Sequence, residues 1–211
     1  MKIVSHRGYW KLPEERNTLA AFERSFSLGF GIETDIRDHD GRIVISHECT
    51  NSDCPSLDSV LKLHKQIAPA LPLALNIKAD GLQSDLLNLL NSYQVENYFV
   101  FDMSIPDTLG YRNYGITYYV RQSEYEPSPT LYEQASGIWL DCFLGDWIEE
   151  KHINQHLEAD KLVCLVSPEL HKRDHHQFWE RLSRMACAAS DRLMLCTDHP
   201  EKARKQFYGK D

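Results

Sequence analysis

The chain has 211 residues, 42% of them hydrophobic and 26% charged, which is the size and composition of one ordinary globular domain. Its formal net charge of -8 argues against a nucleic-acid-binding protein, whose surface should be basic. No apolar run reaches the roughly 20 residues of a membrane span, and no signal-like apolar region of about 7–15 residues follows the N-terminus. We therefore expect a cytoplasmic protein with no transmembrane segment and a single domain over residues 1–211.

Strand-like and helix-like stretches alternate along the chain. Strands are predicted at residues 2–6, 31–37, 72–78, 97–102, 116–120, 137–141, 161–166 and 192–196. Helices are predicted at about 17–28, 56–66, 82–93 and 129–135, in a short turn after Pro106, and from Asp146, Asp174 and Pro200 onward. Eight such units predict an α/β fold whose parallel sheet closes into a (β/α)8 TIM barrel.

Helix ends are predicted from capping residues. Asn17 and Ser56 are the expected N-caps of the first two helices, and Asp146 is expected to start a helix, with Glu149 three residues on in capping-box fashion. Lys210 and Asp211 are expected to fray.

The segment from Gly31 to Glu48 carries the first chemical signal. Side chains alternate along a strand, so Glu33 and Asp35 share one face with their Cα atoms about 7 Å apart. Two such carboxylates suit one hard cation, Mg²⁺ or Ca²⁺. Asp40-Gly41 predicts a tight hairpin turn, and the returning strand ends on His47. The alternative is an edge hairpin with solvated charges.

Further motifs stand before and after this segment. His6-Arg7-Gly8 ends the first strand, and the pairs Pro13-Glu14, Asn17-Thr18 and Ala21-Phe22 follow it. Glu-x-Asp, Asp-Gly-x-x-Val-x-x-His and a closing Thr197-Asp198-His199-Pro200 complete the order. This order resembles the glycerophosphodiester phosphodiesterase family, densely over residues 1–48 and again near the C-terminus. The resemblance implies a phosphoric diester hydrolase on a TIM barrel, here without the inserted small domain of many members.

The resemblance also implies a role for each matching residue. His6 and His47 would be the catalytic acid and base, and Arg7 and Lys78 would bind the substrate phosphate. The metal ligands would be Glu33, Asp35 and Asn76. The cation would be Mg²⁺, with Ca²⁺ as the alternative, and the partner a small-molecule glycerophosphodiester-like or sugar-phosphate diester.

The sequence departs from the family at one proposed ligand. Asn76-Ile77-Lys78 stands where the family has Glu-x-Lys, so an amide replaces a carboxylate. The amide oxygen can still ligate Mg²⁺ or Ca²⁺, but the site loses one negative charge, for which Glu48 and Asp80 are the candidate replacements. The departure leaves open a catalytically weakened relative that binds a phosphorylated ligand. A phospholyase or phospholipase D-like activity on a lipid is a third option, ranked last because the loops are mostly polar.

Six cysteines fall into two groups. Cys49 and Cys54 flank a polar loop after His47, where related sphingomyelinase D-type enzymes carry a disulfide; in a reducing cytosol two free thiols are expected instead. Four others lie in apolar runs and are expected to be buried: Cys142, Cys164, Cys187 and Cys196. The oligomeric state stays open.

Overall fold

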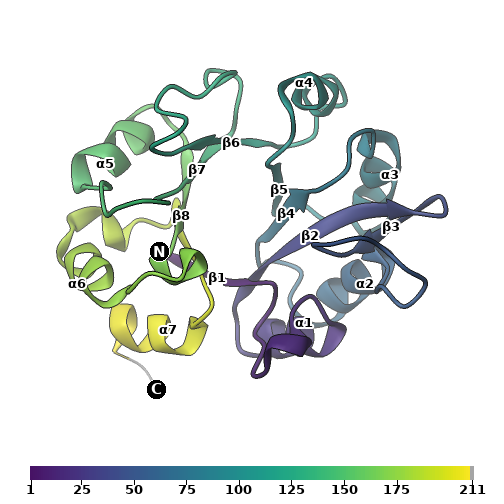
Figure 1. Cartoon of the computed structure of the whole chain (residues 1–211), viewed down its shortest axis with the longest axis horizontal. Helices are drawn as coiled ribbons and strands as arrows, with labels where there is room; N and C mark the ends of the chain where they lie inside the picture. The colour runs from purple at the N-terminus through teal and green to yellow at the C-terminus, as the bar shows by residue number, and fades with distance from the viewer. Residues whose placement is uncertain (210–211) are drawn as a thin grey trace. The chain divides into compact units, whose positions relative to one another are not determined.

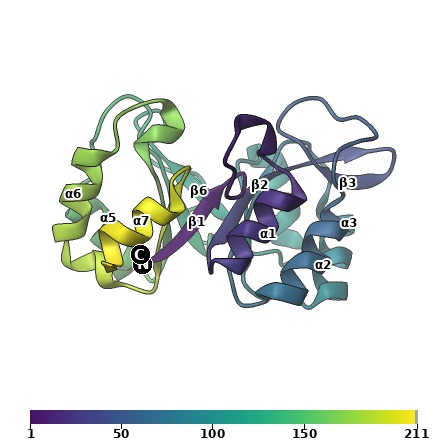
Figure 2. The ribbon, with the colours of Figure 1, turned by 90° about the horizontal axis from the view of Figure 1, so that it is seen from below.

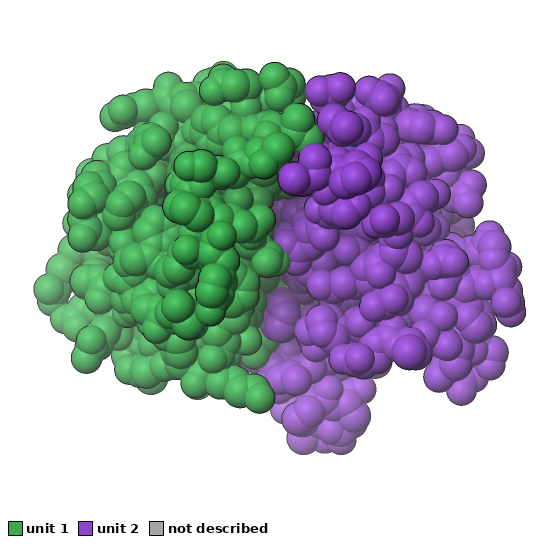
Figure 3. Space-filling view, turned by 45° about the horizontal axis from the view of Figure 1, so that its top comes forward, with its two compact units in different colours: residues 1–5, 119–211 green, residues 6–118 purple. Residues whose placement is uncertain are grey.

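The structure, a computed structural model, describes residues 1–209 and divides into two compact units (Figure 3). Unit 1 comprises Met1–Ser5 and the chain from Tyr119 onward, and unit 2 comprises His6–Tyr118. The two residues expected to fray, Lys210 and Asp211, lie outside the described part.

Unit 2 is built on a short parallel sheet with a hairpin (Figure 1). Its strands are β2 (Gly31–His39), β3 (Arg42–Ile45), β4 (Leu73–Ile77) and β5 (Tyr98–Phe101). β4 pairs in parallel with β2 and β5, and β3 pairs antiparallel with β2. Its helices are α1 (Leu19–Ser27), α2 (Leu57–Ile67), α3 (Gln83–Tyr93) and α4 (Ile105–Asn113), after a 3-10 turn η1 (Pro13–Glu15). Helices α1, α2 and α3 lie side by side in Figure 2.

Unit 1 holds five parallel strands in the order β1-β9-β8-β7-β6. These are β1 (Lys2–His6), β6 (Tyr119–Gln122), β7 (Gly137–Leu140), β8 (Leu162–Val166) and β9 (Leu193–Thr197); His6, the last residue of β1, opens unit 2. The helices are α5 (Glu150–Glu158), α6 (His176–Arg184) and α7 (Pro200–Tyr208), with 3-10 turns η2 (Pro168–His171) and η3 (Ala186–Ala189).

Eight parallel strands and their intervening helices assign the described chain to the predicted (β/α)8 TIM-barrel class. The strands are buried on both faces, as expected for parallel sheets with helical crossovers; all five residues of β9 are buried. Among these buried strand residues are two carboxylates and an amide: Glu33 and Asp35 on β2, and Asn76 on β4. Such burial requires partners for these groups, and it marks the place where chemistry is expected.

The hairpin and the ends of two helices match the prediction. Asp40 and Gly41 both have positive φ, 47° and 73°, as a two-residue turn of the expected kind requires. Ser56 caps α2, where its hydroxyl accepts from the Ser59 N–H. Pro200 lies in the first turn of α7, and Gly209 ends it with a φ of 62°. Helix α4 is longer than the predicted turn after Pro106.

The helix predicted over 129–135 is wrong, because the described chain only turns there between β6 and β7. Pro127 and Pro129 precede it, and Leu131 has a φ of 62°, a conformation that no right-handed helix contains. The strand predicted at 116–120 lies later, at Tyr119–Gln122, where it pairs with Gly137–Leu140.

Two predicted caps are also wrong. Thr18, not Asn17, caps α1 by accepting from the Ala21 N–H, while Asn17 has a φ of 59° and turns toward β2. Asp146 does not start a helix, because it pairs with Arg173 and with Arg181; α5 begins at Glu150 instead, with a capping box between Glu149 and His152.

The cysteines match the expectation. Cys49 and Cys54 are free thiols, and the four cysteines of the apolar runs are free and buried. Within residues 1–209, no helix combines the length and apolar character needed to cross a bilayer.

Candidate active site

The turn after β1 places the first site residues. Arg7 and Gly8 both have positive φ, 56° and 79°. A Cβ at Gly8 would lie 2.9 Å from the Cβ of Ala21 and 2.9 Å from the Phe22 ring, so the chain passes close over α1 and only glycine fits. Arg7, with no such freedom, holds a conformation that costs free energy, and such strain is found mainly where it positions a functional group.

Glu33 lies on β2 with 2% of its surface exposed. Its Oε2 accepts from the Arg7 backbone N–H at 3.2 Å and lies 3.9 Å from Nε2 of His6. Its Oε1 accepts from Nδ2 of Asn76 at 3.4 Å. Burial, together with the negative charge of Asp35, raises the pKa of Glu33 to about 7, against the opposing effect of His6 and Arg7.

Asp35 is surrounded by donors. Its carboxylate accepts from Nδ2 of Asn17 at 2.9 Å and from Nδ1 of His47 at 3.0 Å. Nε of Arg7 lies 3.3 Å away and Nζ of Lys78 3.6 Å away. Burial alone would raise the pKa of Asp35, but the hydrogen bonds from His47 and Asn17 and the two positive charges outweigh it and hold the pKa below its ordinary value. The two carboxylates of β2 therefore differ: Asp35 is ionised at neutral pH, and Glu33 titrates near it.

His47 follows β3 and contacts two groups through one ring nitrogen. Nδ1 lies 3.0 Å from Oδ1 of Asp35 and 2.9 Å from Nη2 of Arg7. A guanidinium carries no acceptor and does not lose its proton, so Nδ1 cannot donate to it. An Nδ1–H donated to the Asp35 carboxylate is the stronger, charge-assisted bond, and it leaves Nε2 as the ring atom that takes or gives a proton. Arg7 then forms an ion pair with Asp35 through its Nε atom.

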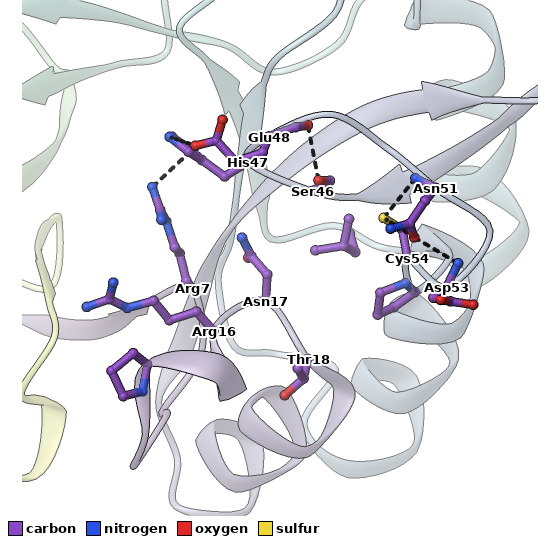
Figure 4. A pocket seen from close by; sticks show the side chains of 13 residues that line it. Arg7, Arg16, Asn17, Thr18, Ser46, His47, Glu48, Asn51, Asp53 and Cys54 are labelled. Carbon is purple, nitrogen blue, oxygen red and sulfur yellow. Dashed lines mark hydrogen bonds and ion pairs between the residues drawn. The ribbon is translucent and has the colours of Figure 1, made fainter.

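A pocket of about 470 Å³ opens beside His47, lined by residues of unit 2 alone. Figure 4 shows Arg7 pointing toward His47 across it, with Asn17 between the α1 end and the hairpin. The pocket lining also includes Arg16, Ser46 and Glu48. The site residues are thus partly open to solvent on the His47 side, where 38% of that side chain is exposed.

The residues present fit a hard cation. Asp35 and Asn76 are directly paired positions on neighbouring strands, and Glu33 lies two residues before Asp35 on the same face. Within the described residues, the buried Oδ1 of Asn76 has no hydrogen-bond partner, so a neutral oxygen is left over beside two carboxylates. Mg²⁺ and Ca²⁺ take oxygen donors of this kind.

Neither residue considered as a substitute for the missing charge fills that role. The Glu48 side chain is 89% exposed and lies beside His47, with Oε1 3.8 Å from Nε2. Asp80 is exposed on the surface and has no described contact with Glu33, Asp35 or Asn76. The carboxylate found near the site is Asp102, whose Oδ2 lies 3.9 Å from Nζ of Lys78.

The structure therefore brings all the sequence-predicted site residues together in unit 2: His6, Arg7, Glu33, Asp35, His47, Asn76 and Lys78. Sequence reasoning missed the part of Asn17, which donates to Asp35 and accepts from Thr34 Oγ1 at 2.9 Å. Asparagine is among the few residues that adopt positive φ readily, and this preference was the one property of Asn17 that could have indicated a turn toward β2.

Solved structures with the same fold include phosphodiesterases. The glycerophosphodiester phosphodiesterase of Agrobacterium tumefaciens has a TM-score of 0.73 at 18% identity, over 100% of both chains. An Oleispira antarctica phosphodiesterase in complex with the product sn-glycerol-3-phosphate has a TM-score of 0.69 at 14% identity, over 98% of this chain and 96% of that one. The glycerophosphodiester phosphodiesterase of Thermotoga maritima has a TM-score of 0.66 at 13% identity, over 96% of each chain.

The chain has the fold of the glycerophosphodiester phosphodiesterases. No family model matches the sequence, and no curated protein is similar to it. The fold that the resemblance of residues 1–48 implied is thus confirmed.

Proposed function

We propose that the chain is a metal-dependent phosphodiesterase acting on a glycerophosphodiester-like or sugar-phosphate diester. The observation that carries the proposal is the pairing of each site histidine with its own buried carboxylate, beside two cationic side chains. His6 lies next to Glu33 and His47 next to Asp35, while Arg7 and Lys78 both face Asp35. The similarity in fold to phosphodiesterases supports the same proposal.

Arg7 and Lys78 are the groups that would bind the phosphodiester. Both are about four-fifths buried, with 21% of each side chain exposed, so their charges are only partly screened by water. Asp35 holds them in place until a substrate anion arrives. Positive groups fixed in this way stabilise the charge that grows on the non-bridging oxygens as the phosphorus is attacked.

His6 and His47 would move the protons. The attacking hydroxyl, from water or from the alcohol of the diester itself, loses its proton to one imidazole as its oxygen bonds to phosphorus. The other imidazole gives a proton to the departing alcohol oxygen as the second P–O bond breaks. Because Asp35 fixes Nδ1 of His47, the exchange takes place at Nε2 of that ring.

The cation would be held by Glu33, Asp35 and the unpartnered Oδ1 of Asn76. When bound, it would neutralise phosphate charge as a Lewis acid. With one amide in the set, affinity for Mg²⁺ should be lower than with three carboxylates. Mg²⁺ as the ion, and the cytoplasm as the location, stay predictions from the sequence.

The product bound by the Oleispira antarctica phosphodiesterase, sn-glycerol-3-phosphate, suggests the substrate class. A small polar diester would match the pocket beside His47, which is lined largely by polar side chains. We also propose that the two units form the single domain predicted from the sequence.

A panel of diesters tests the proposal. Purified protein is incubated with glycerophosphodiesters, glycerol-phosphate-linked sugars and an activated aryl diester, each with Mg²⁺, Ca²⁺ or a chelator. The expected result is turnover that the chelator abolishes and that His6→Ala removes. The matched control is His39→Gln, a partly exposed histidine at the end of β2, which should keep wild-type rates. Turnover unaffected by His6→Ala and Glu33→Ala would contradict the proposal.

One observation favours a second candidate. Asn76 stands where the family has a carboxylate, so the proposed metal site carries less negative charge. Its Nδ2 donates to Oε1 of Glu33. In a catalytically weakened relative, phosphorylated ligands would bind through Arg7 and Lys78 without turnover. Binding of sn-glycerol-3-phosphate that disappears in Lys78→Met, with no hydrolysis of any diester, would favour this candidate over the enzyme.

A further inference from the structure

Three histidines are buried in the described chain: His64, His156 and His175. Nε2 of His64 bonds to the carbonyl of Leu71 at 2.9 Å. His156 is held at both ring nitrogens, by the Tyr132 hydroxyl at 3.0 Å and by Oε1 of Gln122 at 2.7 Å. His175 differs from both: it is 6% exposed, and among the described contacts neither of its ring nitrogens makes a hydrogen bond. Its ring lies instead among other side chains of the kinds that ligate metals.

His175 lies inside a cluster of potential ligands at the start of α6. One ligand atom from each of Asp174, His175 and His176 can be chosen so that all lie within 4.8 Å of one another. The His175 and His176 rings stack with centroids 4.3 Å apart, and Nδ1 of His176 lies 2.5 Å from Oδ1 of Asp174. The ring of His199 approaches His175 to 5.2 Å from the other side. Two imidazoles and a carboxylate this close are a ligand set for a transition metal.

We propose that Asp174, His175 and His176 form a binding site for a divalent transition metal ion such as Zn²⁺. These three residues belong to unit 1, whereas the proposed catalytic residues belong to unit 2. Three protein ligands leave a fourth tetrahedral position for water, the usual arrangement of an open zinc site. Imidazole nitrogens favour Zn²⁺, Ni²⁺ or Cu²⁺ over Mg²⁺ and Ca²⁺, which prefer oxygen.

The surroundings of His175 match those of a metal-ligating histidine. Its Nδ1 faces Oε2 of Glu169 at 3.8 Å, and its ring packs on Trp179 at 4.3 Å between centroids. Metal-bound histidines commonly direct their second nitrogen at a carboxylate, which fixes the tautomer and leaves the first nitrogen for the metal. Glu169 is itself held by the Ser167 and Thr197 hydroxyls and by the Asp198 N–H. Glu169 is thus a fixed carboxylate near Nδ1, and an ion bound through Nε2 would leave that carboxylate beside the second ring nitrogen.

The exposed side of the cluster gives the ion access. The side chains of Asp174 and His176 are 65% and 78% exposed, so an ion can enter without unfolding the segment. The nearby Arg173 does not oppose it, because its guanidinium is engaged by Asp146 and by the carbonyl of Cys142. An ion bound here would fix the segment that enters α6.

The test is a Zn²⁺ titration of metal-free protein, in competition with a chromophoric chelator at pH 7. The background carries Glu33→Gln and Cys49→Ser, so that neither the proposed catalytic site nor the exposed thiol contributes a ligand. We expect one Zn²⁺ per chain, and a loss of affinity of at least about tenfold in His176→Ala, since even an outer-shell partner is worth that much. Asp174→Asn should weaken binding as well.

The control is a histidine–aspartate pair of the same kind outside the cluster. Nε2 of His39 lies 3.6 Å from Oδ2 of Asp40 on the β2–β3 hairpin, and His39→Ala should leave Zn²⁺ affinity unchanged. His176 is exposed, so its replacement does not threaten folding. Equal affinity in His176→Ala and the parent, or an equal loss in His39→Ala, would overturn the proposal. Either outcome is independent of whether the chain hydrolyses diesters.

Discussion

One carboxylate from each unit shows how the partners near the ends of the parallel strands can differ: Asp35 of unit 2 and Glu169 of unit 1. In unit 2, Asp35 is contacted by Arg7, Lys78 and His47, all of which are partly exposed. In unit 1, Glu169 is bonded by two hydroxyls and a backbone N–H. Hydroxyl and backbone donors fix a loop, whereas mobile cationic and imidazole groups can be recruited by an anionic substrate. For Asp35 and Glu169, the kind of partner, more than the carboxylate itself, is what distinguishes the two clusters.

The largest expected effect separates the histidines of the two units. His6→Ala and His47→Ala should each lower kcat for diester hydrolysis by about 10²–10⁴-fold, the usual contribution of a positioned acid or base. His156 in unit 1 is bonded to the Tyr132 hydroxyl and to Oε1 of Gln122 instead of to a carboxylate. His156→Gln should therefore retain kcat within a few-fold. Steady-state kinetics on one diester measures all three variants, and an equal loss in His156→Gln would contradict the comparison.

Stability should move in opposite directions when one carboxylate of each unit is neutralised. The pKa of Glu33 is raised from 4.5 to about 7, so ionised Glu33 destabilises the fold. This penalty grows as the pH rises from 4.5 to 7 and is complete above 7. Glu33→Gln should stabilise metal-free protein at pH 8 by up to about 3 kcal/mol and have little effect at pH 4. Glu169→Gln should destabilise it by about 1–3 kcal/mol, because buried donors lose their acceptor.

Urea unfolding at both pH values measures these free energies. A Glu33→Gln variant less stable than wild type at pH 8 would show that Glu33 serves the fold rather than the chemistry.

Acid should weaken unit 1 through His156. Burial lowers the pKa of this imidazole from 6.5 to about 4, with a smaller contribution from His152. Below pH 6.5 His156 is protonated in the unfolded chain but stays neutral in the folded chain. The free energy of unfolding therefore falls as the pH drops, until His156 of the folded chain is protonated as well, near pH 4. Wild type should lose about 3 kcal/mol over this window relative to His156→Gln. Urea unfolding at pH 7.5 and 4.5 measures the difference, with His39→Gln as the control; a gap that does not change with pH would refute the assignment.

The smallest expected effect concerns the metal site. Asn76→Glu adds a third carboxylate beside Glu33 and Asp35 and should tighten Mg²⁺ binding about tenfold, or 1.4 kcal/mol. Without the cation, the added negative charge should lower the thermal midpoint, because two like charges already face each other there. Calorimetric Mg²⁺ titration and melting curves with and without Mg²⁺ test both parts. Weaker Mg²⁺ binding in Asn76→Glu would mean that the ion binds elsewhere.

The sequence predicted the site better than it predicted unit 1. Strict alternation put Glu33 and Asp35 on one face, and the Asp40-Gly41 turn returned His47 to them; both inferences depend on local geometry alone. The hydrogen bond from Asn17 to Asp35 depends on the positive φ of Asn17. The sequence did not predict it, because asparagine also favours the N-cap position of a helix. In unit 1, nothing in the sequence distinguishes Glu169, whose oxygens accept from two hydroxyls and a backbone N–H, from a catalytic carboxylate.

The measurement that tests the central claim most directly is 31P NMR of a glycerophosphodiester incubated with purified protein and Mg²⁺. The account predicts that the diester resonance is replaced by that of a phosphomonoester or a cyclic phosphate. It also predicts that a chelator, or His47→Ala, prevents the change. An unchanged diester spectrum with correctly folded protein, or conversion that continues in His47→Ala, would contradict it.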